Sequence, residues 1–348
     1  MATHKTTIRS KNKAITLDEI HLNKDVRTKI NQLLEEFTYI DALSTLQIPV
    51  DNKILLHGHT GCGKTATAHA IGLALNKKVI TVNLSGFVSS RLGETGKNLA
   101  ELFQKASSDN AVLFIDEFDF IGKIRDYDTQ DSGEMKRLVN SLIQQIDNLA
   151  DNSLLICATN HIEIIDTALL RRFQIKLNYE LPTQEHLDNY YDDILSNFPD
   201  NINTVERKYG ISYAEAKDVM HQQIKAQVIQ YEKHKKHLVF AYNNLKSNDT
   251  QTKYYGRLLK STHDTIIGYK LNELVPENSS KDESNQINLQ QIAVKSKEKS
   301  DRIEGVVFEI TGEELIQTDR YEAYNCKRVL ETTQSGTDVW IYVAHNSY

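Results

Sequence analysis

Eight consecutive residues carry the glycines, the lysine and the hydroxyl that phosphate binding requires. They read Gly58-His59-Thr60-Gly61-Cys62-Gly63-Lys64-Thr65 and fit the pattern G-x-x-x-x-G-K-[ST]. Glycines let the backbone wrap around a phosphate with its N–H groups pointing inward, at the positive end of the following helix. We expect the Lys64 ammonium to reach the β- and γ-phosphates of ATP and the Thr65 hydroxyl to bind Mg²⁺. The motif lies between an apolar run and an amphipathic stretch, which favours this interpretation over a glycine-rich turn.

Two acidic residues, Asp116 and Glu117, stand directly after the apolar run Val112–Ile115. A carboxylate at a strand tip can hold the water shell of Mg²⁺, and its neighbour can polarise the attacking water. We therefore assign Asp116 to the metal and Glu117 to the water. Alone, such a pair would indicate the solvated start of a loop. Its position downstream of a phosphate loop favours the catalytic role.

Polar residues after two later segments complete the candidate site. Asn160 follows an apolar run that ends at Thr159, and its amide could position the same water against the γ-phosphate. Arg171 and Arg172 stand just before another strand-like segment. They could be ordinary surface charge, or an arginine finger that reaches the γ-phosphate of a neighbouring subunit.

The elements that must position these residues are short apolar runs that alternate with amphipathic stretches. The apolar runs are 54–56, 79–82, 112–115 and 154–157, and the amphipathic stretches are 65–75, 97–106 and 134–146. Fully apolar strands separated by helices imply a parallel sheet that is covered on both faces. The sequence therefore predicts a doubly wound α/β domain, preceded by helices within residues 17–50.

The remainder of the chain changes pattern twice. After Pro182 the spacing of apolar residues is helical through about Tyr231, and a strand-rich region begins at Leu238. The polar stretch 277–302 has few large apolar residues and predicts a long or disordered loop. Strands are expected again at 305–310 and 339–343. The polar residues 1–14 are expected to form a flexible tail.

Composition narrows the function classes. The formal net charge of −6 argues against a general nucleic-acid binder, because such binding needs a basic surface. The short basic cluster Lys233–His237 is expected to be a solvated linker. No apolar run approaches membrane-spanning length, and the start of the chain has no apolar signal region. The three isolated cysteines lack disulfide or metal-ligand spacing, so cytoplasmic residence is the default expectation.

The ordered motifs resemble the AAA branch of the AAA+ ATPase family over roughly residues 15–232. The stretches that carry the resemblance are Gly58–Thr65, Phe114–Asp119, Ala158–His161 and Leu170–Phe173, with Lys208–Ala214 similar to the family's small helical lid. The resemblance implies a homo-oligomeric ring, expected to be a hexamer, with ATP at subunit interfaces and Arg171 or Arg172 acting in trans. It also implies a protein substrate that the ring remodels or threads.

One segment departs from the family pattern. Ser89–Thr95 resembles the first pore loop, where threading members carry an aromatic residue before an aliphatic-glycine pair, and Arg91 occupies that position here. An aromatic side chain grips a polypeptide through a large, rigid contact area, and an arginine grips it differently. A remodelling enzyme that acts once per encounter, or a nucleotide switch, therefore fits as well as a processive unfoldase.

Residues 238–345 resemble the gamma-glutamylcyclotransferase-like fold, a small mixed α+β barrel. Val239–Lys246 is similar to its opening strand and substrate loop, and Ile303–Ile310 to a later strand. The segment that holds Asp319, Glu322, Tyr324 and Arg328 is similar to the part that carries the family's catalytic glutamate, which Glu322 matches. Asn243 and Asn244 replace a glycine and a Ser or Thr, and a side chain there can obstruct a ligand, although Asn tolerates left-handed geometry.

We expect four parts: a tail (1–14), a nucleotide-binding α/β domain (15–180), a helical lid and linker (181–235) and a cyclotransferase-like domain (236–348). Three functions remain open. The first is a remodelling ATPase whose C-terminal domain recruits a substrate or partner. The second is a two-activity enzyme whose C-terminal domain also cleaves γ-glutamyl amines to 5-oxoproline. The third is an ATP-gated scaffold, although a scaffold needs no water-activating carboxylate.

Overall fold

The computed structural model describes residues 15–84, 92–123, 132–274, 290–298, 300–323 and 326–345. The predictions for the tail 1–14, for Arg91 and for Tyr324 fall outside these residues. The chain divides into two compact units, Met1–Gln222 and Gln223–Tyr348, and each is described by itself.

The first unit is built on a five-stranded sheet in which every pairing is parallel. Its strands are β1 (Lys53–Gly58), β2 (Val79–Asn83), β3 (Val112–Asp116), β4 (Leu154–Thr159) and β5 (Ile175–Tyr179), in the order β2-β3-β4-β1-β5. All residues of β4 are buried, as are four of the five in β3. The predicted doubly wound parallel sheet is therefore confirmed.

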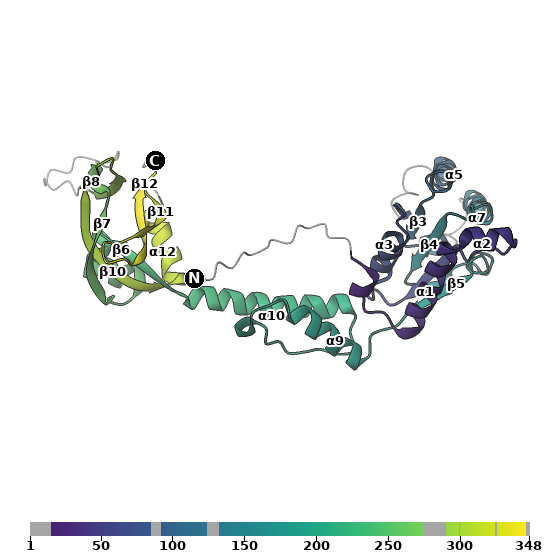
Figure 1. Ribbon diagram of the computed structural model, residues 1–348, viewed down its shortest axis with the longest axis horizontal. Coiled ribbons are helices and arrows are strands. Elements are labelled where there is room, and N and C mark those ends of the chain that lie inside the picture. Colours follow the sequence, from purple (N-terminus) through teal and green to yellow (C-terminus); the bar gives the residue numbers. More distant parts are fainter. Residues whose placement is uncertain are drawn as a thin grey trace. The chain divides into compact units, whose positions relative to one another are not determined.

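Helices cover both faces of this sheet (Figure 1). The helices α1 (Lys24–Thr38) and α3 (Lys64–Ala74) pack on one face, and α5 (Leu92–Ser108) and α7 (Ser132–Asp147) pack on the other. Successive residues of β1 point to opposite faces, so Ile54 and Leu56 join the core under α1 and α3, whereas Leu55 joins the core under α5 and α7. Burial on both faces explains why these strands read as continuous apolar runs.

Shorter elements connect these parts. They are η1 (Leu17–Glu19), α2 (Ile40–Thr45), α6 (Phe120–Lys123), η2 (Ile162–Ile164) and α8 (Thr167–Leu170).

Two longer helices follow the sheet, α9 (Gln184–Leu195) and α10 (Tyr213–His234). The prediction of a helical pattern through Tyr231 is wrong for residues 196–212, where only η3 (Asp200–Ile202) is helical. A hydrogen bond and an ion pair hold this segment in place instead. The Tyr191 hydroxyl donates to the Lys208 carbonyl at 3.1 Å, and Arg207 pairs with Asp188 at 2.8 Å. Among the described residues, no helix combines the length and apolar character needed to cross a bilayer.

The second unit contains a mixed seven-stranded sheet with the order β7-β10-β6-β12-β9-β8, and β11 pairs with β12 (Figure 1). Its strands are β6 (Lys236–Ala241), β7 (Ser261–Ile267), β8 (Tyr269–Leu274), β9 (Gln290–Lys295), β10 (Arg302–Thr311), β11 (Cys326–Thr332) and β12 (Asp338–Ala344). Its helices are η4 (Asn244–Lys246), α11 (Asn248–Tyr255) and α12 (Gly312–Glu322). The mixed sheet agrees with the predicted class of this part of the chain.

Strand β9 corrects the prediction of a loop over residues 277–302. It pairs antiparallel with β8 and parallel with β12, and Ile292 and Ala293 are 3% and 0% exposed. The strand is short and flanked by polar residues, so its few apolar positions gave no periodic signal. Pairing with two neighbouring strands, rather than local composition, makes this segment extended.

Helix α12 begins against another backbone segment of the same unit. Thr311 and Glu314 form a capping box at its start. A Cβ atom added to Gly312 would lie 2.0 Å from the carbonyl oxygen of Glu232, in the last turn of α10. Glycine is required here because the obstructing atom belongs to the backbone and cannot rotate away.

We predict that Gly312→Ala lowers the unfolding free energy of the second unit by about 1–3 kcal/mol, as expected for overpacking. Trp340 on β12 is the only tryptophan of the chain, so its fluorescence during urea unfolding reports on this unit. Gly96→Ala is the matched control, because a Cβ atom there would meet no atom within 4 Å. Equal urea midpoints for the two variants would contradict the predicted clash.

Candidate nucleotide-binding site

The glycine-rich segment after β1 forms a tight loop that only glycine accommodates at three positions. The φ angles of Gly58, Gly61 and Gly63 are 118°, 72° and 99°, all in the left-handed region. Gly63 is the N-cap of α3, so the loop delivers its N–H groups to the positive end of that helix. The backbone therefore has the form that an anionic phosphate requires.

Lys64 lies inside the loop that precedes it. Lys64 is 8% exposed, and its ammonium donates to the carbonyl oxygens of Gly58 at 2.8 Å and His59 at 2.7 Å. Burial lowers the pKa of Lys64, and the nearby Asp116 and Asp119 carboxylates oppose this shift. The ammonium is thus held where the loop surrounds a phosphate site.

Thr65 and Asp116 bring two oxygen ligands together from α3 and β3. The Thr65 hydroxyl donates to Asp116 Oδ2 at 3.1 Å, although the two residues are 51 positions apart in sequence. Hydroxyl and carboxylate oxygens suit Mg²⁺, which commonly binds one or two protein groups and completes its shell with water and phosphate oxygens. The pair fits that role. Among the described residues there is no cluster of three or more His, Cys, Asp or Glu side chains that could hold a metal by itself.

Glu117 adopts an unusual backbone conformation. Its φ angle is 53°, in the left-handed region that few residues other than glycine enter. Its N–H donates to Asp116 Oδ1 at 2.9 Å, and the next N–H, of Phe118, donates to the Ala158 carbonyl at 2.8 Å on β4. These bonds hold the turn after β3 so that Glu117 is exposed beside Asp116. Backbone strain of this kind gathers at functional sites.

A buried carboxylate ties the tips of β3 and β4 together. Asp119 is 4% exposed and accepts a hydrogen bond from the Thr159 hydroxyl at 3.0 Å. The N–H of His161 donates to the same hydroxyl at 2.9 Å, which fixes the backbone on both sides of Asn160. The sequence analysis gave neither Asp119 nor Thr159 a role.

One open cavity of about 420 Å³ unites the predicted phosphate and water residues. Its lining includes Lys64, Thr65, Asp116, Glu117 and Asn160, and also Thr60, Gly61, Gly63, Ala66 and Ala214. The Ala214 N–H donates to the Gly61 carbonyl at 3.1 Å, so the start of α10 contacts the phosphate loop. Sequence reasoning did not assign Ala214 to the site.

The two adjacent arginines have different surroundings. Arg172 donates to the Asp147 carboxylate at 3.2 Å through Nε and to the Ala168 carbonyl at 2.6 Å through its Nη1 atom. Arg171 is exposed, and its side chain makes no hydrogen bond or ion pair with the residues that the structure describes. Neither arginine lines the phosphate cavity. Of the two, only Arg171 has a side chain that can change direction without breaking a contact with the described residues.

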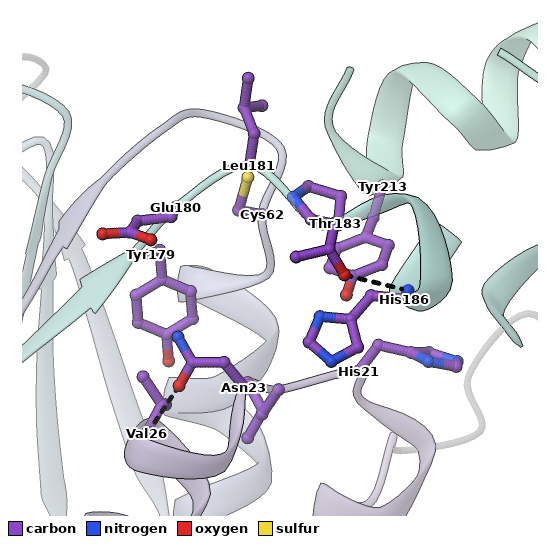
Figure 2. Close-up of a pocket in the computed structure, with 12 residues that line it drawn as sticks. His21, Asn23, Val26, Cys62, Tyr179, Glu180, Leu181, Thr183, His186 and Tyr213 are labelled. Carbon is purple, nitrogen blue, oxygen red and sulfur yellow. Dashed lines mark hydrogen bonds between the residues drawn. The ribbon is translucent and has the colours of Figure 1, made fainter. Parts of the chain in front are cut away.

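A second cavity, of about 80 Å³, lies beside the phosphate loop at Cys62 (Figure 2). Four regions distant in sequence contribute to its lining: residues 21–26 before and in α1, Cys62 in the loop, residues 179–186, and Tyr213 at the start of α10. Tyr179 is 4% exposed, and its hydroxyl is buried beside Thr67 of α3. Of these residues, the sequence predicted a nucleotide-binding role only for Cys62, because no local pattern links the others to the phosphate loop.

Aromatic rings line one wall of this second cavity. The His21 ring lies 5.2 Å from the Tyr190 ring and 5.7 Å from the Tyr213 ring, between ring centres. His21 Nε2 is 3.1 Å from the Asp193 carboxylate, but burial has the larger effect and lowers the pKa of His21. Flat rings beside a phosphate loop suit a planar aromatic ligand.

Glu322 lies in the second unit, at the end of α12. Its residue is 2% exposed, and the Asn243 side chain donates to Glu322 Oε1 at 3.0 Å. Burial raises the pKa of Glu322 above its usual range. The structure places Glu322 beside the loop that follows β6, but its catalytic role stays a prediction.

A strand, a glycine-rich loop, a helix and an acidic residue on a neighbouring parallel strand define a P-loop nucleotide-binding domain. Residues 54–181 match the family described as "ATPase family associated with various cellular activities (AAA)". Residues 239–348 match the family described as "Gamma-glutamyl cyclotransferase, AIG2-like". The chain therefore joins an AAA ATPase domain to an AIG2-like domain, which confirms the predicted fusion.

Similar proteins share the AAA part. An uncharacterized AAA family ATPase of Sinorhizobium fredii is 35% identical over 204 residues, which are 58% of this chain and 62% of that protein. The 26S proteasome regulatory subunit 8 homolog of Schizosaccharomyces pombe is 34% identical over 167 residues, 46% of this chain and 41% of that protein. The peroxisomal ATPase PEX1 of Saccharomyces cerevisiae is 36% identical over 141 residues, 39% of this chain and 13% of that protein. The chain thus spans less than two thirds of the length of each of these relatives.

The contacts of the two arginines predict a larger loss of stability for the Arg172 variant than for the Arg171 variant. Arg172→Ala removes hydrogen bonds to Asp147 and Ala168 and should lower the free energy of unfolding by about 0.5–1.5 kcal/mol. Arg171→Ala, the matched control one residue away, should change it by less than about 0.5 kcal/mol. Thermal unfolding of both variants checks this, and a larger loss for Arg171→Ala would contradict the assignment.

Proposed function

We propose that the first unit binds Mg²⁺-ATP and hydrolyses it to ADP and phosphate. The observation that carries this proposal is the convergence of Lys64, Thr65, Asp116, Glu117 and Asn160 on one cavity. Each of these groups has a chemical task in phosphoryl transfer. A scaffold that only binds nucleotide would not need an exposed carboxylate beside the metal ligand.

The loop and Lys64 account for phosphate binding. Backbone N–H groups of residues 60–65 face the phosphates, and the Lys64 ammonium exchanges its loop carbonyl partners for the β- and γ-phosphate oxygens. Thr65 and Asp116 hold Mg²⁺, directly or through water. When bound, Mg²⁺ neutralises the charge that develops on the phosphate oxygens.

Glu117 and Asn160 account for the attack of water. Glu117 accepts a proton from a water molecule that Asn160 positions in line with the bond between the γ-phosphorus and the leaving oxygen. The new bond forms between the water oxygen and phosphorus as the bond to ADP breaks. Because Glu117 is exposed at the tip of β3, its side chain can reach this water without leaving its turn.

The second cavity is proposed as the nucleobase site. It meets the phosphate cavity at the loop, since Cys62 lines one and Gly61 and Gly63 line the other. His21 and Tyr213 supply aromatic surface for a planar base. One nucleotide would therefore contact three parts of the first unit: the segment 21–26 that precedes the sheet, the phosphate loop, and the start of α10.

We further propose that the chain forms a homo-oligomeric ring, expected to be a hexamer, in which Arg171 contacts the γ-phosphate in the neighbouring subunit. The named relatives include a proteasome regulatory subunit homolog and a peroxisomal ATPase. By analogy, the proposed substrate is a protein, which the C-terminal domain recruits in the cytoplasm. The net charge of −6 gives no support for a nucleic-acid partner.

Glu117→Gln should bind ATP but release phosphate about 10²–10⁴-fold more slowly, because the amide cannot accept the proton of water. Steady-state phosphate release and retention of labelled ATP measure the two effects. Glu163→Gln is the matched control, since Glu163 is an exposed carboxylate after β4 that pairs with His161. Unchanged phosphate release by Glu117→Gln would refute the assignment of the base.

A mixing experiment tests the site between subunits. Lys64→Ala subunits lack the phosphate contact, and Arg171→Ala subunits lack the proposed finger, so each preparation alone should be inactive. Mixtures should regain part of the ATPase activity, because an Arg171 from one variant can complete the intact loop of the other. Two Lys64→Ala preparations mixed together give the baseline. Absence of recovery at every ratio would count against action in trans.

A further inference from the structure

The second unit holds a buried polar cluster that the ATPase proposal does not use. It lies where the loop after β6 meets the end of α12 and the start of β11. Its members are the side chains of Tyr242, Asn243, Glu322 and Cys326 and the backbone N–H of Leu245. Glu322 is 2% exposed and Cys326 is 6% exposed. A buried carboxyl group requires a hydrogen-bonding partner, and the partner here is unusual.

The Asn243 side chain forms two hydrogen bonds in this cluster, one as a donor and one as an acceptor. Its Nδ2 donates to Glu322 Oε1 at 3.0 Å, and its Oδ1 accepts from the Leu245 N–H at 3.2 Å. The backbone of Asn243 is extended, with φ −109° and ψ −150°, so the left-handed geometry considered from the sequence is not used. A single amide therefore bridges a carboxyl group and a backbone donor.

The walls around this amide are fixed by other bonds. The Tyr242 hydroxyl donates to the Tyr342 carbonyl at 2.7 Å and accepts from the Ala293 N–H at 3.0 Å. Gln251, 4% exposed, donates to the Leu245 carbonyl at 3.1 Å and holds the loop from its other side. The loop thus has supports that do not depend on the Asn243 side chain.

We propose that Glu322 and the Leu245 N–H form a binding site for a primary carboxamide, and that Asn243 of the same chain is its resident occupant. A carboxamide offers one N–H donor to Glu322 and one carbonyl acceptor to Leu245, which matches both groups. A carboxylate would face Glu322 without a donor, and a tertiary amide has no N–H. This proposal is independent of the ATPase site.

Occupation by Asn243 has a functional consequence. An external amide can reach Glu322 only by displacing a group that is already attached to the loop, and attachment gives that group a high effective concentration. The native domain should therefore not cleave γ-glutamyl amines. This outcome favours a recruiting role for the C-terminal domain over the two-activity enzyme.

Chemical complementation tests the site. Asn243→Gly removes the atoms of acetamide from the cluster, so added acetamide should raise the unfolding midpoint of this variant, in full-length protein, by about 4–8 °C at a concentration that restores about 1 kcal/mol. Trp340 fluorescence follows the transition. Acetate and N,N-dimethylacetamide at equal concentration should give no such rise, and neither should acetamide with the native chain.

Asn244→Gly is the matched control, because it deletes the same atoms from an exposed neighbour whose side chain contacts Tyr321 rather than Glu322. A saturable rise limited to acetamide and Asn243→Gly supports the site. An equal response of Asn244→Gly, or an equal effect of acetate or dimethylacetamide, would overturn it. So would release of 5-oxoproline from γ-glutamyl amines by the native protein.

If Asn243→Gly does not fold, Asn243→Asp keeps the proposal testable. Its carboxyl group would face Glu322, with Cys326, Tyr242, Tyr255 and Tyr321 as the other titratable groups nearby. Two facing carboxyl groups raise each other's pKa, so the variant is expected to be stable at low pH and to lose stability as pH rises. A loss of stability relative to the native chain that is the same at pH 5 and pH 8 would show that the contact does not exist.

Discussion

Strand β1 pairs in register with β4 on one side and β5 on the other, and this parallel pairing decides where the polar groups of the first unit lie. Because all five strands run in one direction, Gly58, Asp116 and Thr159 end at the same edge of the sheet. The Thr65–Asp116 bond and the Asp119–Thr159 bond are short because the register brings their strands level. The chemistry proposed here depends on that alignment more than on any single side chain.

The sequence alone predicted those parts of the fold and of the candidate site whose geometry is encoded by a local pattern of residues. The glycine spacing from Gly58 to Gly63 predicts a loop with positive φ angles, and apolar runs predict the strands that carry Asp116 and Asn160. The second cavity could not be predicted, because His21, Cys62, Tyr179 and Tyr213 meet only through the tertiary fold. Arg171 and Arg172 were equivalent in sequence, and the contacts of Arg172 with Asp147 and the Ala168 carbonyl distinguish them in the structure.

The second unit was harder to predict because its strands owe their conformation to their neighbours. Strand β9 contains few apolar residues, yet it is extended between β8 and β12. Asn243 was recognised as a replacement, but its effect depends on the direction of one side chain. An extended backbone directs the amide toward Glu322, and no pattern in the surrounding residues specifies that direction.

The contact between Gly58 and β5 has a consequence for how this domain can change over evolutionary time. A Cβ atom on Gly58 would lie 2.2 Å from the Tyr179 carbonyl oxygen, which also accepts a hydrogen bond from His59 at 2.8 Å. The phosphate loop and the strand that leads to the second cavity therefore share one backbone junction. A side chain at position 58 is expected to disturb the loop and the strand together, whereas side chains downstream of Tyr179 can vary without moving this junction.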